Sequence, residues 1–236
     1  GDGSDALAEA PVELPAFGYR AFHGGPRAGI RPPEPDPACA FETPFYTVRL
    51  DRDGQRIESI WDKALRRELL DSASAYAFGE FLYVHAEEKH ALPVTVEYPR
   101  RRGMSVRVGP LATEVVLDSF EEQSGANVRV VLTFYRQEKN IDVHLSFRNA
   151  AGLMGDYYDR YKKSLFFAFP FLVENHRFCT ELSGGIVDER VDRMPVNPHD
   201  FVMAHSWISV ENGDWGIGLF CREMPLFHPG GIHYNR

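Results

Sequence analysis

The sequence predicts an all-β fold, and three observations carry this prediction. Apolar and polar residues alternate with a period of two in several segments, most clearly in residues 127–136 and 140–149. The turn dipeptides Asp53-Gly54 and Asn212-Gly213 lie between pairs of apolar segments. No long segment has the 3.6-residue period of an amphipathic helix. Many short strands without long helices favour a β-sandwich.

The N-terminal part divides into short pieces before the main domain. Residues 1–10 are acidic and rich in Ala and Gly, which is typical of a linker or of the start of an expressed fragment. Residues 11–22, which include "VELPAFGYRAF", are strand-like. Residues 23–39 are dense in Gly and Pro, which interrupt helices and central strands. We therefore expect a connector at 23–39 and one β domain over residues 40–236.

The first hairpin is expected between residues 41–50 and 55–61, around Asp53-Gly54. The segment that follows, "SIWDKALRRELLD" (59–71), permits two interpretations. Trp61, Leu65 and Leu69 lie near helical spacing, but the segment is short for a helix and its first residues continue a strand. We predict a strand followed by an irregular charged turn.

A three-stranded meander is expected in the middle of the chain. Its strands are the segments 114–120, 127–136 and 140–149, and its turns are Ser124-Gly125 and Lys139-Asn140. In the third strand one face is apolar and the other is polar. The apolar residues are Ile141, Val143, Leu145 and Phe147, and the polar ones are Asp142, His144, Ser146 and Arg148.

Near the C-terminus, "SWISVENGDWGIGLF" (206–220) has Asn212-Gly213 between two apolar runs, which is a strong hairpin signal. We expect a type I′ turn with both of these residues at positive φ. Alternation places two sets of side chains on opposite faces of the hairpin. One set is Trp207, Ser209 and Glu211, and the other is Ile208 and Val210.

Composition excludes several classes of partner. The chain has 26 basic and 34 acidic residues and a formal charge of -8, so we expect no nucleic-acid partner. The longest apolar run, which begins at Leu165, has about half the length of a membrane helix, so we expect no membrane partner. Three widely spaced cysteines (Cys39, Cys179 and Cys221) and the absence of an Asn-x-Ser/Thr site favour a cytoplasmic location.

Four segments together resemble one known family. "IESIWDKALRRELLD" (57–71) is similar to the Ile-x-Ser-Leu-x-Asp-Lys-x-x-x-Arg-Glu-Leu pattern in the C-terminal β domain of glycoside hydrolase family 38 α-mannosidases. "VELPAFGYRAF" (12–22) resembles the Leu-Pro-x-x-Gly-Tyr-Arg segment of the small β domain that precedes it. "KKSLFFAFPF" (162–171) and residues 184–220 resemble two later segments. The four segments follow the family's order.

The resemblance implies a galactose-mutarotase-like supersandwich, in which Asp62-Lys63 is a bend between strands. In the family, zinc or another divalent metal and the nucleophilic aspartate belong to an N-terminal α/β barrel, and a helical region follows it. Retaining hydrolysis needs a nucleophilic carboxylate and a proton donor facing one sugar, and no segment here matches the nucleophile motif. The resemblance therefore implies a non-catalytic domain without a cofactor of its own, whose partners are the barrel and helical region of the same protein. It also implies that Arg236 lies before the usual end of the family's β region.

The resemblance further implies carbohydrate contacts, which some family members make through the tyrosine of a Gly-x-Tyr-Leu-Phe segment. The matching residues here are 79–83, with phenylalanine at the tyrosine position. This leaves Glu80, Tyr83 and the nearby Tyr76 as candidate carbohydrate-binding residues. The competing interpretation is an aromatic core strand. Trp215, like Trp207, is a candidate for stacking on a sugar, and core packing is again the alternative.

Two other functions remain as alternatives. An aldose epimerase or mutarotase needs a histidine acid and a glutamate base on opposite sides of a pyranose. His176 would be the acid, and Glu181 or Glu223 the base. A stand-alone carbohydrate-binding module is the second alternative. We expect no metal site, because the spacings of His199-Asp200 with His205 and of His228 with His233 do not match a zinc motif.

Overall fold

The computed structural model describes residues 40–51, 56–85, 95–97, 100–122, 126–148, 163–192, 201–221, 223 and 226–230. The expected linker (1–10), terminal strand (11–22) and connector (23–39) lie outside these residues. Seventeen strands and their turns, without a helix, make up the described part, and all strand pairs are antiparallel. The predicted all-β class is confirmed. The described residues contain no helix long and apolar enough to span a membrane.

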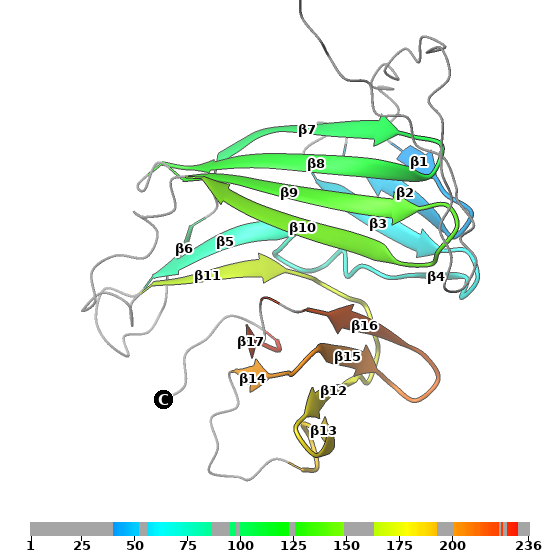
Figure 1. Cartoon of the computed structure of the whole chain (residues 1–236), viewed down its shortest axis with the longest axis vertical. Helices are drawn as coiled ribbons and strands as arrows, with labels where there is room; N and C mark the ends of the chain where they lie inside the picture. The colour runs from blue at the N-terminus through cyan, green and yellow to red at the C-terminus, as the bar shows by residue number, and fades with distance from the viewer. Residues whose placement is uncertain are drawn as a thin grey trace, which may run out of the picture.

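One layer is a sheet of four long strands that lie side by side (Figure 1). In spatial order they are β10 (Ile141–Arg148), β9 (Ala126–Tyr135), β8 (Ala112–Glu121) and β7 (Arg100–Val108). β8, β9 and β10 form the predicted meander, and their register is unbroken. The predicted Ser124-Gly125 turn lies outside the described residues. β7 is an additional strand, and a bulge between Arg101 and Gly103 shifts its register.

Two shorter sheets form the opposing layer. The first has the order β1 (Ala40–Glu42), β2 (Tyr46–Leu50), β3 (Ile57–Asp62) and β4 (Arg67–Glu68). The second has the order β11 (Lys163–Ala168), β5 (Glu80–His85) and β6 (Thr95–Glu97). The β2–β3 pair confirms the first predicted hairpin pairing. The segment after β3 is a turn over residues 63–66, which confirms the prediction of a strand followed by a turn.

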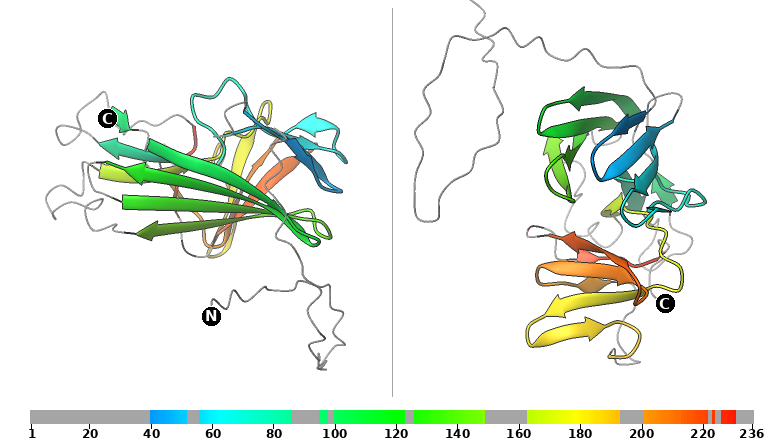
Figure 2. Two further views of the ribbon diagram at one scale, coloured as in Figure 1. Left: turned by 90° about the horizontal axis from the view of Figure 1, so that it is seen from above. Right: turned by 90° about the vertical axis from the view of Figure 1, so that its right-hand side faces the viewer.

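The hydrophobic core lies between the two layers, whose ribbons face each other in the turned views of Figure 2. Every second residue of β9 points into it, because successive strand residues face opposite sides. The main cluster is Tyr46, Val48, Leu50, Ile57, Ile60, Leu69, Leu70, Phe78, Val115, Val130, Leu132 and Phe134. A second cluster is Phe81, Tyr83, Ala126 and Val128. The long sheet is thus covered by β1–β4 at one end and by β11-β5-β6 at the other.

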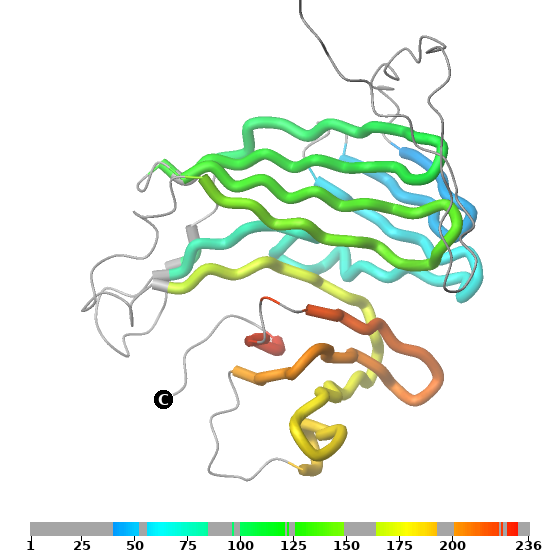
Figure 3. Tube along the Cα trace, viewed as in Figure 1, coloured from blue at the N-terminus to red at the C-terminus, as the bar shows by residue number. Residues whose placement is uncertain are grey.

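A smaller C-terminal unit follows the sandwich. Its main sheet has the order β13 (Gly185–Asp188), β12 (Arg177–Leu182), β15 (Trp207–Glu211) and β16 (Gly216–Phe220). The pair β14 (Val202–Met203) and β17 (Leu226–Phe227) lies on one face of it. A third cluster, which includes Val202, Ala204 and Ile208, fills the space between them. Figure 3 shows the chain running from β11 directly into this unit.

The β15–β16 hairpin is present, but its turn differs from the prediction. Ile208 and Val210 are buried and pair with Leu219 and Ile217, as the alternation predicts. The type I′ prediction is wrong, since Gly213 has φ +94° and Asn212 is not among the positive-φ residues. The loop spans residues 212–215, since Glu211 pairs with Gly216. The Asn212 side-chain oxygen accepts hydrogen bonds from the N–H groups of two loop residues, Asp214 and Trp215. The Asn212 side chain therefore shapes the turn without a left-handed backbone.

Candidate functional site

The polar residues that carry the family resemblance have structural partners. Glu68 accepts a hydrogen bond from the Ser59 hydroxyl at 2.6 Å. Its other oxygen accepts bonds from the N–H groups of Ile60, Leu69 and Leu70 at 2.8, 3.1 and 3.1 Å. The carboxylate thus accepts backbone donors at the end of the β3–β4 pairing, where the Leu69 N–H also donates to the Ile60 carbonyl at 3.0 Å. Glu68 holds β3 to the segment that follows β4.

Asp62 and Lys63 shape the turn between β3 and β4. Asp62 is 2% exposed, and one of its oxygens accepts the N–H groups of Ala64 and Leu65, each at 2.9 Å. Its other oxygen lies 2.7 Å from Nζ of Lys139, which belongs to the β9–β10 connection. Lys63 donates to the Thr43 carbonyl at 2.7 Å. These charged groups make hydrogen bonds and ion pairs that join strands and shape the turn.

Glu80 lies in a small hollow at the start of β5. One of its oxygens accepts the Ala77 N–H at 2.7 Å, and the other pairs with Arg101 of β7. Gly79 precedes it at φ +72°, which a residue with a Cβ rarely adopts. Arg56 and Asp118 also line the hollow. Glu80 thus joins the two layers at a polar hollow and is not free for a second strong ionic contact.

The two candidate tyrosines lie in different environments. Tyr83 is 3% exposed and packs in the second core cluster with Phe81 and Val128. Tyr76 lies in the turn before β5, where its N–H donates to the Ser74 hydroxyl at 3.1 Å. Residues 81–84 are all buried, which agrees with the interpretation of this segment as an aromatic core strand. The Tyr83 ring therefore presents no open face.

Trp215 lies at the junction of the C-terminal unit and the sandwich. Its ring packs against the main core cluster, and the Arg67 guanidinium lies 4.7 Å from the ring centroid. A cation over an aromatic face is attracted by the negative charge of that face. The indole N–H is buried without a hydrogen-bond partner. The partly buried ring thus lies between a guanidinium and the core, far along the chain from Glu80 and Tyr83.

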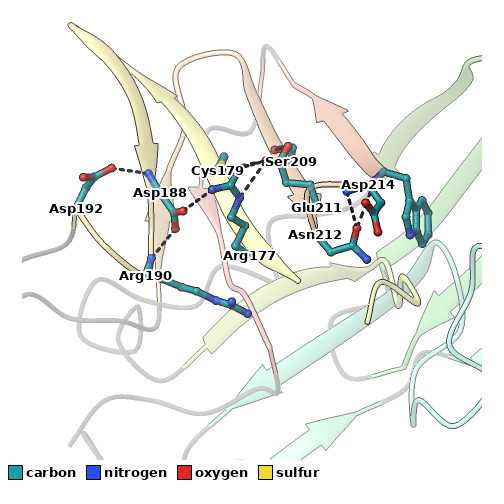
Figure 4. A network of polar contacts seen from close by, with 10 residues as sticks. Arg177, Cys179, Asp188, Arg190, Asp192, Ser209, Glu211, Asn212 and Asp214 are labelled. Carbon is teal, nitrogen blue, oxygen red and sulfur yellow. Dashed lines mark hydrogen bonds and ion pairs between the residues drawn. The ribbon is translucent and has the colours of Figure 1, made fainter. Parts of the chain in front are cut away.

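A polar network on β12, β13 and β15 was not predicted from the sequence (Figure 4). Arg177 donates to Glu211 from Nε and Nη2, at 3.1 and 2.8 Å, and to Asp188 from Nη1 at 3.0 Å. Ser209 donates to Glu211 at 3.3 Å. Only the strand register shows this network, because Arg177 and Glu211 are directly opposite each other on neighbouring strands but 34 residues apart in sequence.

Cys179 lies within this network as a neutral thiol. Its Sγ is 3.8 Å from Glu211, and the residue is buried. Burial raises the pKa of Cys179 above its ordinary value, and the negative charge of Glu211 raises it further, while Arg177 acts in the opposite direction. A thiol with a raised pKa is a poor nucleophile at neutral pH. This agrees with the interpretation of Cys179 as a small apolar residue.

Of the groups proposed for an epimerase, His176 and Glu181 are not brought together. His176 directly precedes β12, and its Nδ1 lies 2.9 Å from the Val173 carbonyl oxygen. Glu181 is five residues further along the extended chain, so about 16 Å separates their backbones. It accepts a hydrogen bond from Ser206. An acid and a base that flank one pyranose must lie much closer.

No group of three or more His, Cys, Asp or Glu side chains in the described part could hold a metal ion. His199, Asp200 and His233 lie outside the described residues. The described residues thus provide no set of metal ligands, and the family resemblance places the zinc in the barrel and not in this domain.

Comparisons with protein-family models, curated proteins and solved structures found no match.

Proposed function

We propose that this chain is a non-catalytic β domain of a glycoside hydrolase family 38 α-mannosidase-like enzyme, and that it supports the catalytic barrel of that protein. The proposal is supported by four segments that resemble the family in its own order. The observation that carries it is that Asp62, Lys63 and Glu68 have structural roles. These residues form the core of the most specific segment, and all three are occupied in joining strands.

The proposal assigns each part of the reaction. Hydrolysis of α-mannosidic bonds, the zinc or other divalent metal and the nucleophile belong to the barrel of the parent protein. The barrel and the helical region are the partners of this domain, and a cytoplasmic location follows from the cysteine usage. In this chain, carboxylates such as Glu68, Asp62 and Glu80 already accept hydrogen bonds from backbone or cationic groups. These carboxylates are therefore suited to hold the fold together and not to act as nucleophiles on a sugar.

The native polypeptide provides the test. An antibody raised against the purified chain would be used to isolate the protein from its source, and its peptides would be sequenced by mass spectrometry. We expect a longer polypeptide that contains a barrel and hydrolyses an aryl α-mannoside, whereas the purified chain alone does not hydrolyse it with or without zinc. A native polypeptide no longer than this chain, or one with an unrelated catalytic domain, would contradict the proposal.

A further inference from the structure

One face of the C-terminal sheet carries a strip of side chains that crosses all four strands, and it is exposed at its β16 end, whereas Cys179 in its middle is buried. This face is opposite to the one that buries Ile208 and Val210. The strand register aligns one row of four residues across it. In order from β16 to β13, the row is Gly218, Ser209, Cys179 and Asp188. The neighbouring rows place Phe220 opposite Trp207 at one side, and Gly216, Glu211 and Arg177 at the other.

The β16 end of the strip is flat and aromatic. Phe220 is 81% exposed, the highest value among the large exposed hydrophobic side chains of the described part. A Cβ placed on Gly218 would lie 3.2 Å from Cε2 of Phe220, so the ring lies close over this glycine. Gly216 and Gly218 are themselves exposed and add no side chain beside the ring. An apolar ring on an uncovered floor is a surface on which another flat, partly apolar group can lie.

The β12–β13 end of the strip is polar and held in place. Arg177 uses three of its five N–H groups on Glu211 and Asp188, so the guanidinium is fixed between two carboxylates. Ser209 is tied to Glu211 and lies between this network and the glycines. Fixed donors and acceptors next to an apolar surface lose little conformational entropy when a ligand binds.

We infer that this strip binds a neutral oligosaccharide. A pyranose has an apolar C–H face, which suits the Phe220 ring, and hydroxyl groups, which suit the fixed groups of Ser209, Glu211 and Arg177. Three inter-strand spacings make the strip about 14 Å wide, which accommodates a short chain of sugars. The charges of Arg177, Glu211 and Asp188 sum to one negative charge, which disfavours polyanions. The inference rests on this geometry and is independent of the mannosidase proposal.

The test is calorimetric titration of the purified chain with α-mannotriose, cellotriose and maltotriose, and with a heparin tetrasaccharide as the anionic probe. We expect at least one neutral trisaccharide to bind with a Kd of about 1 mM or tighter. Phe220→Ala is expected to weaken that binding about tenfold or more. Because Phe220 is exposed, this variant should keep the melting temperature of the parent chain.

Two further variants separate the polar contribution from general effects. Arg177→Lys keeps the positive charge and loses the planar fork, so it should also weaken binding about tenfold. Leu226→Ala removes another exposed apolar side chain, on β17 and away from the strip, and should leave the Kd unchanged.

Any of three titration results would overturn the inference. The first is no binding of any neutral trisaccharide, the second is equal Kd values for Phe220→Ala and the parent chain, and the third is tighter binding of the heparin tetrasaccharide. A dimer in light scattering that Phe220→Ala dissociates would also overturn it, since the strip would then pair with a second copy. Because the titration uses the chain alone, its outcome is separate from the identity of the native polypeptide.

Discussion

Glu68 shows how much structure one side chain can organise. Its carboxylate accepts bonds from one hydroxyl and three backbone N–H groups in a region where strand pairing ends. Hydrogen bonds to a charged acceptor are stronger than those between neutral groups. Residues of this kind contribute to the fold through backbone donors and not through packing.

We predict that Glu68→Ala lowers the free energy of unfolding by about 2–3 kcal/mol, because the N–H groups lose a charged acceptor in a half-buried place. Urea denaturation measures the loss. The matched control is Glu58→Ala, which removes an exposed glutamate from the same strand pair and should cost less than about 0.5 kcal/mol. Equal losses in the two variants would mean that the Glu68 bonds do not stabilise the fold.

A second prediction at this scale concerns alkaline pH. Burial, together with the negative charge of Asp62, raises the pKa of Tyr46 to about 12. The unfolded chain ionises this group near pH 10, so its contribution to stability is complete below about pH 10 and is lost as the pH rises to about 12. We expect the stability of the parent chain to fall by up to about 3 kcal/mol from this group over that interval. Urea midpoints across the interval should fall less steeply in Tyr46→Phe.

Tyr135→Phe is the control. A hydrogen bond to Asp142 is the main cause that raises the pKa of Tyr135 to about 12, but this pair lies on the exposed face of the sheet. Solvent screening there reduces the contribution of the Tyr135–Asp142 pair to the pH dependence of stability. A Tyr46→Phe profile that is as steep as that of the parent chain would contradict the assignment.

At the scale of the elements, the β15–β16 hairpin combines local and distant interactions. Its loop is held locally by Asn212, while Trp215 contacts the sandwich through the core and Arg67. The same hairpin therefore closes its own turn and fastens the C-terminal unit to the rest of the molecule. The Leu70–Phe171 bridge holds the segment that leads from β11 to this unit against the sandwich.

We predict that Trp215→Ala lowers the unfolding free energy by about 2–3 kcal/mol, because a large partly buried ring and a cation–π contact are lost. Gly213→Val should cost about 1–2 kcal/mol, since φ is +94° but the space around the Cβ is open. Urea midpoints for both variants, with exposed Asp214→Ala as the control, decide the order. A smaller loss for Trp215→Ala than for Gly213→Val would mean that Trp215 does not fasten the two parts.

At the scale of the whole molecule, a second ion pair, in addition to Glu80–Arg101, joins the two layers of the sandwich. Lys139 from the β9–β10 connection reaches Asp62, which is almost completely buried, at 2.7 Å. A buried carboxylate that loses its cation retains the cost of desolvation. This pair therefore reports on the packing of one layer against the other.

A double-mutant cycle with Asp62→Ala and Lys139→Ala should give a coupling free energy of about 1–2 kcal/mol. The control pair is Asp118 and Arg129, at 2.7 Å within one sheet, whose side chains are more exposed. Its coupling should be less than about 1 kcal/mol and should fall with added salt. Equal couplings for the two pairs would show that the Lys139 contact does not join the layers more strongly than a surface pair.

The sequence by itself determined the fold class, the central meander and the pairing of two hairpins. These features depend on neighbours in the chain, because a period of two directs alternate side chains to one face and Gly or Asn permits a tight turn. The strand-and-turn structure of residues 57–68 was predictable for the same reason. The arginine-rich β7 was not, since Arg100, Arg101 and Arg102 give it a weak alternation and its pairing depends on a bulge.

The tertiary structure alone decided which candidate residues are buried and which polar groups meet. Tyr83 and Trp215 have the residue types of a sugar platform, yet Tyr83 is buried in a core cluster and Trp215 is partly buried between Arg67 and the main core. The strip of side chains on the C-terminal sheet exists only through the register of four strands. Two of these, β12 and β15, are separated by more than 20 residues of sequence. Burial and cross-strand contact belong to pairs of distant segments, whereas periodicity and turn preference belong to adjacent residues, so only the latter can be read directly along the chain.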